Sequence, residues 1–475
     1  MLVVLNSGMG SSLTGNAIQY ISKEFAVDSQ VQKALPMSMF LVGPIVWAPL
    51  SEEYGRRIIV IVTFPLFTVF TMGCALAPSW SAFLGFRLLS GMLGSSIVAL
   101  GPGIISDIYR DPTTRGWSIA VFMGRQGTGF GPMLGPIVSG FVSPAMGWRW
   151  SFWIALILAG VTLLFVAWFP ETYQPVLVRI YAPRHLPESR IEDPQPFKQR
   201  NRQWRSILQG VLLRPLHLLF TEPVVAACSM YLALCYSIFY MSFAVFPYIF
   251  QEVYSLSPGQ CGLVQLTIGV GCILSLPIYW AYERILLGIV DISLARNKQE
   301  LHRLPLACLG GPLFVISLFW LGWSSREDVS FAVPMMAGIP FGIGFMCVFI
   351  AVLYFSLHLI KSVKYTLINE RTRNYITDAY RLFAASANAA SSCSRSFFAT
   401  FLPLASYPML SQLGITGACS LLGGLSALMS VVPFVLIWKG EAIRSRSRFC
   451  NALKSGDDDP EVTHVNRNPV EELVV

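Results

Sequence analysis

Residues 150–169 read WSFWIALILAGVTLLFVAWF, a run of twenty residues without a charged side chain. A helix of about 20 mostly apolar residues crosses the hydrocarbon core of a bilayer, so this stretch predicts a transmembrane helix. Comparable stretches recur along the chain and make twelve in all: 2–22, 32–50, 58–78, 82–106, 117–143, 150–169, 223–247, 260–282, 304–324, 330–353, 383–407 and 415–438.

The composition also indicates a membrane protein. Hydrophobic residues make up 54% of the 475 residues and charged residues only 13%, whereas soluble domains carry about 25% charged residues. Backbone polar groups inside lipid must be satisfied within the spanning segment, which favours helices. We therefore expect an all-α membrane protein with twelve transmembrane helices in a lipid bilayer. The apolar stretch that follows Met1 is interpreted as the first span and not as a signal peptide.

The basic residues predict the orientation of the chain. With the N-terminus in the cytoplasm, the outer loops hold only Lys23, Lys33, Arg149 and Arg326. Three of the 34 Lys and Arg residues lie within spans (Arg87, Arg125 and Arg395), and the remaining 27 fall at cytoplasmic positions. This asymmetry places both termini in the cytoplasm, and it accounts for the net charge of +8 without a nucleic-acid partner.

A long polar stretch divides the chain into two halves. Residues 1–170 form a first half of six helices, 171–221 a basic cytoplasmic loop, 222–438 a second half of six helices, and 439–475 a polar cytoplasmic tail. Two halves of six spans predict two repeats related by an axis along the membrane normal.

No cofactor and no metal are expected. The ten cysteines are scattered, mostly within apolar spans and without a CxxC pair, which is typical of small core residues. The five histidines fall in loops or in the tail. An enzyme is disfavoured, because no histidine cluster and no pair of nucleophile and base lies within the spans.

The loop between the second and third spans is the first candidate site. It reads Ala48-Pro-Leu-Ser-Glu-Glu-Tyr-Gly-Arg-Arg57. Gly55 permits a tight turn between two helices, while Glu52, Arg56 and Arg57 bring opposite charges to one membrane surface. We interpret these four residues as a charge clamp that holds and releases neighbouring helices. Ordinary positive-inside charge is the alternative interpretation.

This loop resembles the signature loop of the major facilitator superfamily, and its PLSE-YGRR pattern is similar to that of the fungal drug:proton antiporter branch with twelve spans. Other stretches resemble the same branch: Phe86-Arg-Leu-Leu-Ser-Gly-Met-Leu-Gly-Ser95, Gly131-Pro-Met-Leu-Gly-Pro-Ile-Val-Ser-Gly140, Pro170-Glu-Thr-Tyr173 and Asn374-Tyr-Ile-Thr-Asp-Ala-Tyr380. The resemblance covers residues 2–449 and is specific through the combination of these motifs.

The resemblance implies a secondary active transporter. It would export drugs, toxins or secondary metabolites by alternating access and proton antiport, as a monomer in the plasma membrane. It also implies that Arg87, which matches the span-four arginine of the family, takes part in proton coupling.

The resemblance further implies an antiporter motif that seals the interface of the fifth span against leakage, formed by Gly131, Pro132, Gly135, Pro136 and Gly140. The chemistry of these residues agrees with that role. Small residues spaced by four let another helix approach closely, and prolines free carbonyl groups inside a membrane helix.

Other side chains are candidates for lining a substrate cavity: Asn6, Arg125, Gln126, Tyr236, Tyr240, Phe243, Gln265, Asn388 and Arg395. Tyr236, Tyr240 and Phe243 share one face of span seven because of their spacing. Arg395 matches a family arginine early in span eleven. Alternatives for the arginines are snorkelling or contacts to backbone carbonyls, and for the amides hydrogen bonds between helices.

The carboxylates are informative through their positions. No Asp or Glu falls at mid-membrane depth, and the nearest lie at cytoplasmic ends of spans: Glu52, Asp107, Glu171, Glu222, Glu283 and Asp378. Family members often carry an acidic residue before a Phe-Pro pair in span seven, where this chain reads Phe243-Ala-Val-Phe-Pro247. The proton-binding site is therefore not evident. Buried arginines without acidic partners favour an anionic or carbonyl-rich substrate, and polyamine export is the disfavoured alternative.

Three departures from the family pattern leave a second class of function open. Residues 354–373 are an atypical insertion, either a retained intron in the gene model or a genuine cytoplasmic loop at the membrane surface. The second span is about one helical turn short, and the polar N-terminal tail of family members is missing. A membrane sensor that kept the fold and lost transport is the alternative to an exporter.

Overall fold

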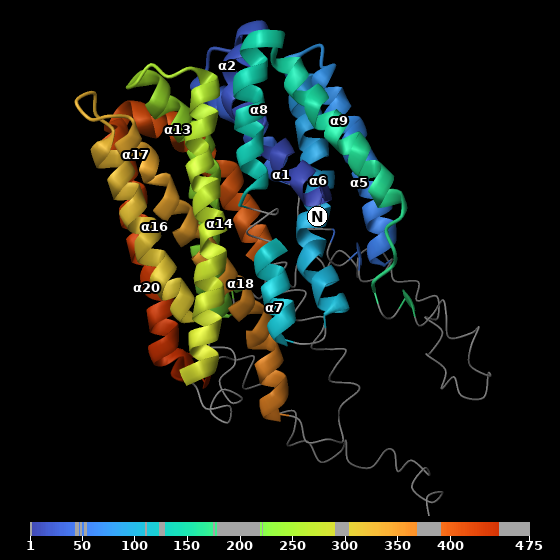
Figure 1. Ribbon diagram of the computed structural model, residues 1–475, viewed down its shortest axis with the longest axis vertical. Coiled ribbons are helices and arrows are strands. Elements are labelled where there is room, and N and C mark those ends of the chain that lie inside the picture. The colour runs from blue at the N-terminus through green and yellow to red at the C-terminus, as the bar shows by residue number, and fades with distance from the viewer. Residues whose placement is uncertain are drawn as a thin grey trace, which may run out of the picture.

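The computed structural model is a bundle of long helices (Figure 1). It describes residues 2–42, 55–109, 112–122, 129–173, 222–289, 304–367 and 391–445, with a few residues between these ranges. In this part of the chain all regular structure is helical, and eight helices are long and apolar enough to cross a membrane. Each of the twelve predicted spans contains helix, so the predicted all-α membrane fold is confirmed.

Residues 2–173 supply the helices of the predicted first half, which Figure 1 shows in blue to green. Their bounds are α1 (Leu2–Ser12), α2 (Thr14–Glu24), α3 (Gln30–Leu41), α5 (Arg56–Ala75), α6 (Trp80–Ile108), α7 (Pro112–Val121), α8 (Gly131–Met146) and α9 (Trp148–Ala167).

Residues 222–445 supply the helices of the predicted second half. Their bounds are α13 (Pro223–Glu252), α14 (Pro258–Ile289), α16 (Leu304–Ser324), α17 (Ala332–Met336), α18 (Gly338–Leu367), η6 (Leu402–Ala405) and α20 (Ser406–Ser445). Residues 391–401 are also helical and lead into η6. The helix α18 continues through the first part of the predicted insertion 354–373.

Several predicted spans consist of two helical pieces. The first span breaks at Leu13, between α1 and α2. The α1 sequence ends Gly-Met-Gly-Ser-Ser, and glycine and serine are weaker helix formers than alanine. Near the other end of the chain, Gly414 has φ 69° and ψ 174°, which interrupts α20 between the predicted eleventh and twelfth spans. Glycine adopts a positive φ without a steric cost.

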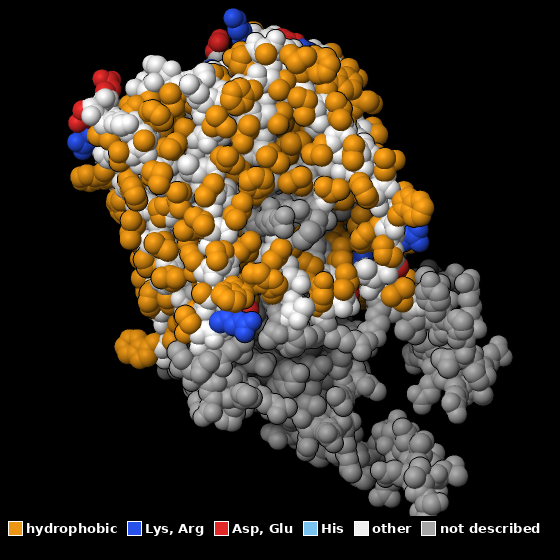
Figure 2. Space-filling view, in the orientation of Figure 1, with side chains coloured by type: hydrophobic (Ala, Val, Ile, Leu, Met, Phe, Trp, Pro, Cys, Tyr) orange, Lys and Arg blue, Asp and Glu red, His pale blue; other side chains and the backbone are white. Residues whose placement is uncertain are grey.

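The outer surface is apolar over most of the height of the bundle. Figure 2 shows hydrophobic side chains covering the face, while the charged side chains gather toward its two ends. On α9, Ile157, Leu164 and Phe165 are each more than 60% exposed. Such large exposed apolar areas are unusual in soluble monomers and fit a surface that faces lipid.

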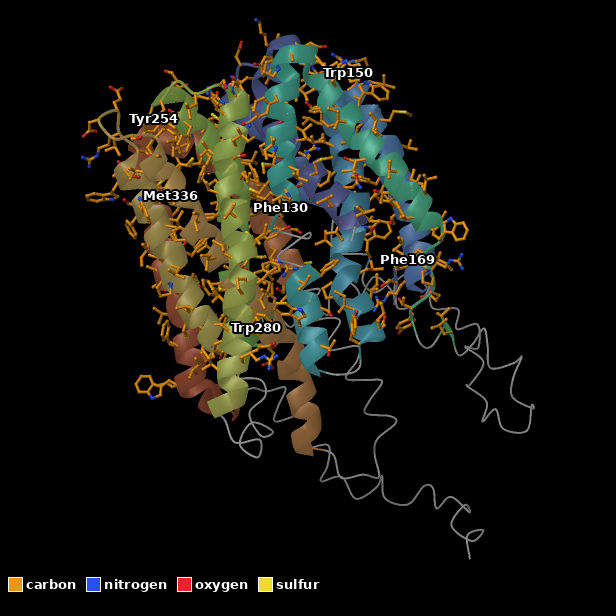
Figure 3. The ribbon with its side chains drawn as sticks, in the orientation of Figure 1. Phe130, Trp150, Phe169, Tyr254, Trp280 and Met336 are labelled. Atoms are coloured by element: carbon orange, nitrogen blue, oxygen red, sulfur yellow. The ribbon has the colours of Figure 1, made fainter. Side chains whose placement is uncertain are left out.

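Aromatic side chains lie near both ends of this apolar surface. Figure 3 shows Trp150 and Tyr254 toward one end of the bundle, Trp280 toward the other, and Phe169 between them. Aromatic rings are enriched at the two membrane–water interfaces. The positions of Trp150, Tyr254 and Trp280 fit rings near the two surfaces of a membrane.

Candidate functional site

Arg56 is the centre of a polar cluster at the end of the bundle that the sequence predicts to be cytoplasmic. Its Nε lies 3.3 Å from Oδ2 of Asp107, at the end of α6. Its Nη1 donates a hydrogen bond to Ser51 Oγ, and its guanidinium lies 5.2 Å from the centre of the Tyr173 ring. The side chain of Arg56 is only 7% exposed and that of Asp107 is 18% exposed, so this ion pair is shielded from water.

Glu171 holds the beginning of α5 in the same cluster. Its two carboxylate oxygens accept hydrogen bonds from the backbone N–H groups of Arg56 and Arg57, each at 3.1 Å. Oε1 also accepts from the N–H groups of Thr172 and Tyr173, both at 2.9 Å. The first N–H groups of a helix lack partners within the helix and favour a negative charge. Glu171 therefore caps α5 from a distant part of the sequence.

Gly55 makes this cap possible. Its φ of 94° and ψ of 158° lie in a region that L side chains rarely adopt. A Cβ at this position would lie 2.6 Å from Oε2 of Glu171. Gly55 therefore meets two requirements at once, the backbone turn before α5 and room for the carboxylate.

The predicted charge clamp is thus only partly located by the structure. Gly55, Arg56 and Arg57 come together with Glu171 and Asp107, whereas Glu52 lies outside the described residues. The sequence places Glu171 and Asp107 at the cytoplasmic surface but assigns them no role. The Pro170-Glu-Thr-Tyr173 stretch is the signal that links Glu171 to this loop, because it belongs to the same set of family-like motifs.

Arg87 is 1% exposed. Its side chain binds the end of α1, at the break between the two helices of the first span. Its Nη1 and Nη2 donate to the carbonyl oxygens of Gly10 (2.8 Å) and Ser11 (3.2 Å) at the end of α1. Its Nε donates to the Pro36 carbonyl at 3.0 Å, and Phe40 packs 4.6 Å from its guanidinium carbon. The last carbonyls of a helix lack N–H partners and favour a positive charge, so Arg87 caps α1.

The glycines of α8 let two other segments approach closely. A Cβ on Gly135 would meet Ser12 Oγ and the Met9 carbonyl, the latter at 2.8 Å, whereas a Cβ on Gly140 would run into the Pro258 carbonyl. The two glycines therefore serve different neighbours: Gly135 admits the first span and Gly140 admits the start of α14.

The prolines of α8 leave carbonyl groups without a helical donor. Pro136 has no N–H to offer to the Pro132 carbonyl four residues earlier, and Ser12 Oγ donates to that carbonyl instead at 2.5 Å. Asn16 Nδ2 donates to the Pro136 carbonyl at 2.9 Å and to the Pro258 carbonyl at 3.0 Å. The predicted antiporter motif, which begins at Gly131, is thus bonded to the first span and, through Asn16, to α14.

Phe130 and Gln265 extend this contact along α14. Figure 3 shows Phe130, just before α8, lying beside α14, and a Cβ on Gly269 would meet its ring at 3.3 Å. Gln265 shares a face of α14 with Gly262 and Gly269, because the spacings are three and four residues. It is fully buried, and neither of its amide atoms has a hydrogen-bond partner in the described part of the chain.

The aromatic residues of α13 that were predicted to line a cavity are buried against several helices. Tyr236 and Tyr240 pack with ring centres 4.9 Å apart, and Tyr240 lies 5.9 Å from Phe243. The Tyr240 hydroxyl and Ser11 Oγ are 3.4 Å apart and share a hydrogen bond. The backbone carbonyl of Phe243 would lie 3.4 Å from a Cβ on Gly15. This face of α13 therefore contacts the first span.

Arg395 approaches the same aromatic group from the helix 391–401. Its guanidinium carbon lies 5.9 Å from the Tyr236 ring centre and 5.4 Å from that of Phe349 on α18. Its Nη2 donates to Ser392 Oγ at 2.8 Å. Its Nη1 is buried and has no acceptor among the described residues.

Of the remaining candidates for the substrate cavity, the structure describes Asn6 but not Arg125, Gln126 or Asn388. Asn6 donates to Thr162 Oγ1 of α9 at 2.7 Å, so its amide takes part in a hydrogen bond between helices. Arg125, Gln126 and Asn388 lie outside the described residues. Three or more His, Cys, Asp or Glu side chains do not meet in a metal-binding group anywhere in the described ranges.

The model of the Major Facilitator Superfamily matches residues 1–366 of the chain. The chain belongs to the major facilitator superfamily. Members of this superfamily are transporters, so the chain is a membrane transporter and not an enzyme.

Curated relatives of this major facilitator protein are fungal transporters. The efflux pump FUB11 of Gibberella moniliformis is 33% identical over 460 residues, which cover 94% of this chain and 72% of that protein. The citrinin biosynthesis cluster MFS transporter mrr1 of Monascus ruber is 32% identical over 452 residues, covering 92% of this chain and 84% of the relative.

A solved major facilitator structure has the same fold. The xylose transporter XylE of E. coli, in a partially occluded inward-open conformation, matches with a TM-score of 0.60 and 16% identity. The match covers 92% of this chain and 95% of the transporter. The predicted major facilitator fold is thereby confirmed.

Proposed function

We propose that this major facilitator transporter exports small amphipathic organic molecules by alternating access, in exchange for protons. The observation that carries the proposal is the tight packing of α8 between the first span and α14. The Ser12 hydroxyl satisfies the Pro132 carbonyl, which Pro136 leaves without a helical donor. Asn16 donates to the Pro136 carbonyl, and Gly135 and Gly140 let the neighbouring segments approach α8 closely. A continuous seal of this kind lets a transporter move substrate without an ion leak.

The direction of transport is supported by the relatives. FUB11, 33% identical across 94% of this chain, is named an efflux pump, and mrr1 is named a transporter of a biosynthesis cluster. Small organic metabolites are therefore the substrate class that we propose for this chain. Polyamines are disfavoured, because α13 carries no acidic side chain from Pro223 to Gln251.

We propose that the two halves are residues 1–170 and 222–438, on either side of the cytoplasmic loop 171–221. They meet along a seam with the first and fifth spans on one side and the seventh and eighth spans on the other. Near the predicted outer end, Asn16 reaches Pro258 and Gln19 Nε2 donates to Gln251 Oε1. Toward the other end, the rings of Trp117 and Tyr279 stack with centres 5.9 Å apart and an angle of 13°. In our proposal the halves rock about this seam.

The cluster around Arg56 would steady the first half at the cytoplasmic side during this motion. Arg56 joins α5 to α6 through Asp107, and Glu171 joins α5 to the segment after α9. Three segments therefore move as one body as long as both carboxylates keep their charge. Release of either contact would free the end of α5.

Arg87 would contribute to proton coupling through its charge, and it would not itself carry the transported proton. A guanidinium keeps its proton at physiological pH, and the three hydrogen bonds that the Arg87 guanidinium makes go to backbone carbonyls. Its proposed contribution is a fixed positive charge beside the break in the first span, which alters the proton affinity of nearby groups. The proposed setting is a monomer in the plasma membrane with both termini in the cytoplasm.

The test is dye efflux from cells that lack their own pumps, measured with and without a protonophore. A Gly135→Ala variant should stop efflux, because the added Cβ would strike the Met9 carbonyl and Ser12. A matched Gly160→Ala variant should not, since a Cβ there has open space around it. The amount of protein at the cell surface and the size-exclusion profile are compared for wild type and the two variants.

Each outcome is informative. Efflux that collapses with the protonophore supports a proton-driven exporter, whereas efflux that persists argues against proton exchange. If a correctly folded protein at the cell surface exports none of a broad panel of dyes and antifungal compounds, the proposed function fails and the sensor alternative gains support.

A further inference from the structure

The structure describes two arginines within the spans, the buried Arg87 and the partly buried Arg395, and they differ in their partners. Arg87 has three carbonyl acceptors, at 2.8 to 3.2 Å. Arg395 has one, the Ser392 hydroxyl on its own helix, and its buried Nη1 has none among the described residues. Arg87 is thus held by the fold, whereas the described residues leave part of the hydrogen-bonding capacity of Arg395 unused.

The charge of Arg395 is also uncompensated in the part of the chain that the structure describes. The ion pairs found there join Arg56 to Asp107 and Arg149 to Glu24. A guanidinium inside a membrane protein without a counter-charge is energetically costly and marks a functional site by default. An anionic ligand would remove this cost and supply the missing acceptor.

The aromatic rings around Arg395 indicate that such a ligand would also have an apolar body. Tyr236 and Phe349 come from different helices, and their ring centres are 6.3 Å apart with an angle of 32°. Both lie within 6 Å of the guanidinium carbon. Aromatic faces offer apolar contact to a flat or apolar body, while a guanidinium recognises a carboxylate through two parallel N–H groups.

We propose that Arg395 is the anion-recognition residue of the transporter and that its substrates are organic carboxylates with an aromatic or otherwise apolar body. This assignment rests on the proposed export function and narrows its substrate class. Cations would be repelled by Arg395, and neutral molecules would leave its charge uncompensated. The carboxylate would bond to the guanidinium, and the apolar body would lie against Tyr236 and Phe349.

The site is connected to the first half of the protein. Tyr236 packs on Tyr240, and the Tyr240 hydroxyl shares a hydrogen bond with Ser11 of α1. The Ser11 carbonyl in turn accepts from Arg87. A ligand that moves Tyr236 therefore acts on a contact between the two halves, which is the contact that alternating access must change.

The first experiment measures binding to the purified full-length protein by calorimetry. The probes are 2-naphthoate and 2-naphthamide, which have nearly the same shape and differ in charge. Wild-type protein should bind the carboxylate at least roughly tenfold more tightly than the amide, because hydrogen bonds to charged groups are the stronger ones. Arg395→Gln should lose this preference, while Arg326→Gln, an exposed loop arginine, should keep it.

A second measurement separates ligand binding from a structural role. Without ligand, Arg395→Gln should unfold at the same temperature as wild type or higher, because the change removes a partly buried charge that has no counter-charge among the described residues. A clear fall in unfolding temperature would show that Arg395 holds the fold. Arg395→Lys keeps the charge without the planar fork, so it should bind naphthoate more weakly than wild type and still prefer it to naphthamide.

Transport then distinguishes failure of this inference from failure of the proposed function. Efflux is measured with fluorescein, an aromatic carboxylate, and with the cationic ester rhodamine 6G. Export of fluorescein that Arg395→Gln abolishes supports the inference. Export of rhodamine 6G alone overturns it and leaves the exporter intact. Export of fluorescein that Arg395→Gln leaves unchanged overturns the role of Arg395. If neither dye leaves the cell and the broad panel of compounds also stays inside, the proposed function itself is contradicted.

Discussion

Ser12 donates a hydrogen bond from its hydroxyl to the carbonyl of Pro132 at 2.5 Å. The two residues lie 120 positions apart, on the first span and on α8. Pro136 has no N–H for that carbonyl, so the serine replaces the missing helical donor. A gap in the hydrogen bonding of one helix is in this way the attachment point of another.

Ser12→Ala should lower the free energy of unfolding by about 1 kcal/mol, because a buried carbonyl loses its donor. Pro136→Ala restores an N–H four residues after Pro132, so the serine change should cost less in that background. Thermal and denaturant unfolding of the four purified proteins in mixed micelles measures this. An equal cost in both backgrounds would show that the Ser12 bond does not compensate for the proline.

Gly140→Ala should open the seam between α8 and α14 near its predicted outer end, because the added Cβ would run into the Pro258 carbonyl. Cys261, fully buried three residues further along α14, serves as the reporter. Its labelling in intact cells by a membrane-impermeant maleimide, mapped by mass spectrometry, should rise in Gly140→Ala. It should stay at the wild-type level in Gly160→Ala; unchanged labelling in both would contradict the role of Gly140.

Glu171→Ala should destabilise the protein by about 1–2 kcal/mol, the usual cost of a lost helix cap, and slow transport. Four backbone N–H groups lose their acceptor. Glu171→Gln keeps one acceptor oxygen and loses the charge, so its effect should be smaller. Unfolding temperature and initial efflux rate are compared with Glu327→Ala, an exposed outer-loop change. Equal effects of Glu171→Ala and Glu327→Ala would rule out the cap.

Glu24 should give the stability of the protein a measurable pH dependence. Partial burial acts to raise the pKa of Glu24, but hydrogen bonds from Arg149 and Trp148 outweigh it, so the pKa lies below its ordinary value of 4.5. The native carboxylate then binds protons less readily than the unfolded one. Its contribution to stability is complete above pH 4.5 and is lost as the pH falls below the lowered pKa.

The measurement is the difference in unfolding temperature between wild type and Glu24→Gln. Wild type should be the more stable protein at neutral pH, and the difference should shrink toward about pH 3. The reason is that Glu24 joins α2 to Trp148, at 2.6 Å, and to Arg149, and both bonds weaken when its carboxylate takes up a proton. A difference that does not change with pH would assign the effect to packing alone.

The position of the spans could be predicted from the sequence, because a bilayer selects for apolar runs of a fixed length. The break at Leu13 could not, since it lies inside such a run and is stabilised by Arg87 from a distant helix. The spacing of the loop predicts Glu52 as a partner of Arg56 and Arg57, and Glu52 lies outside the described residues. Local spacing gives no information on Glu171, whose contact to Arg56 spans 115 positions.

For the candidate residues of the second half, too, the sequence predicts which residues share a helix face but not which contacts they make with distant residues. The spacing of Tyr236 and Tyr240 places them on one face of α13, and the structure brings them together there. Which of the buried arginines still has hydrogen-bonding capacity was not readable from the sequence. That depends on backbone carbonyls, which every residue carries, and only the fold decides that Arg87 meets three of them.

The bonds of Arg87 have an electrical consequence for the membrane. A guanidinium tied to three carbonyls keeps a permanent positive charge inside the bilayer, and in a medium of low dielectric constant its potential extends over many ångströms. Sodium and potassium ions approaching the middle of the protein would meet this potential as a barrier. We therefore expect the side chain that closes the gap in the first span also to repel inorganic cations from its surroundings, in every conformation in which those bonds persist.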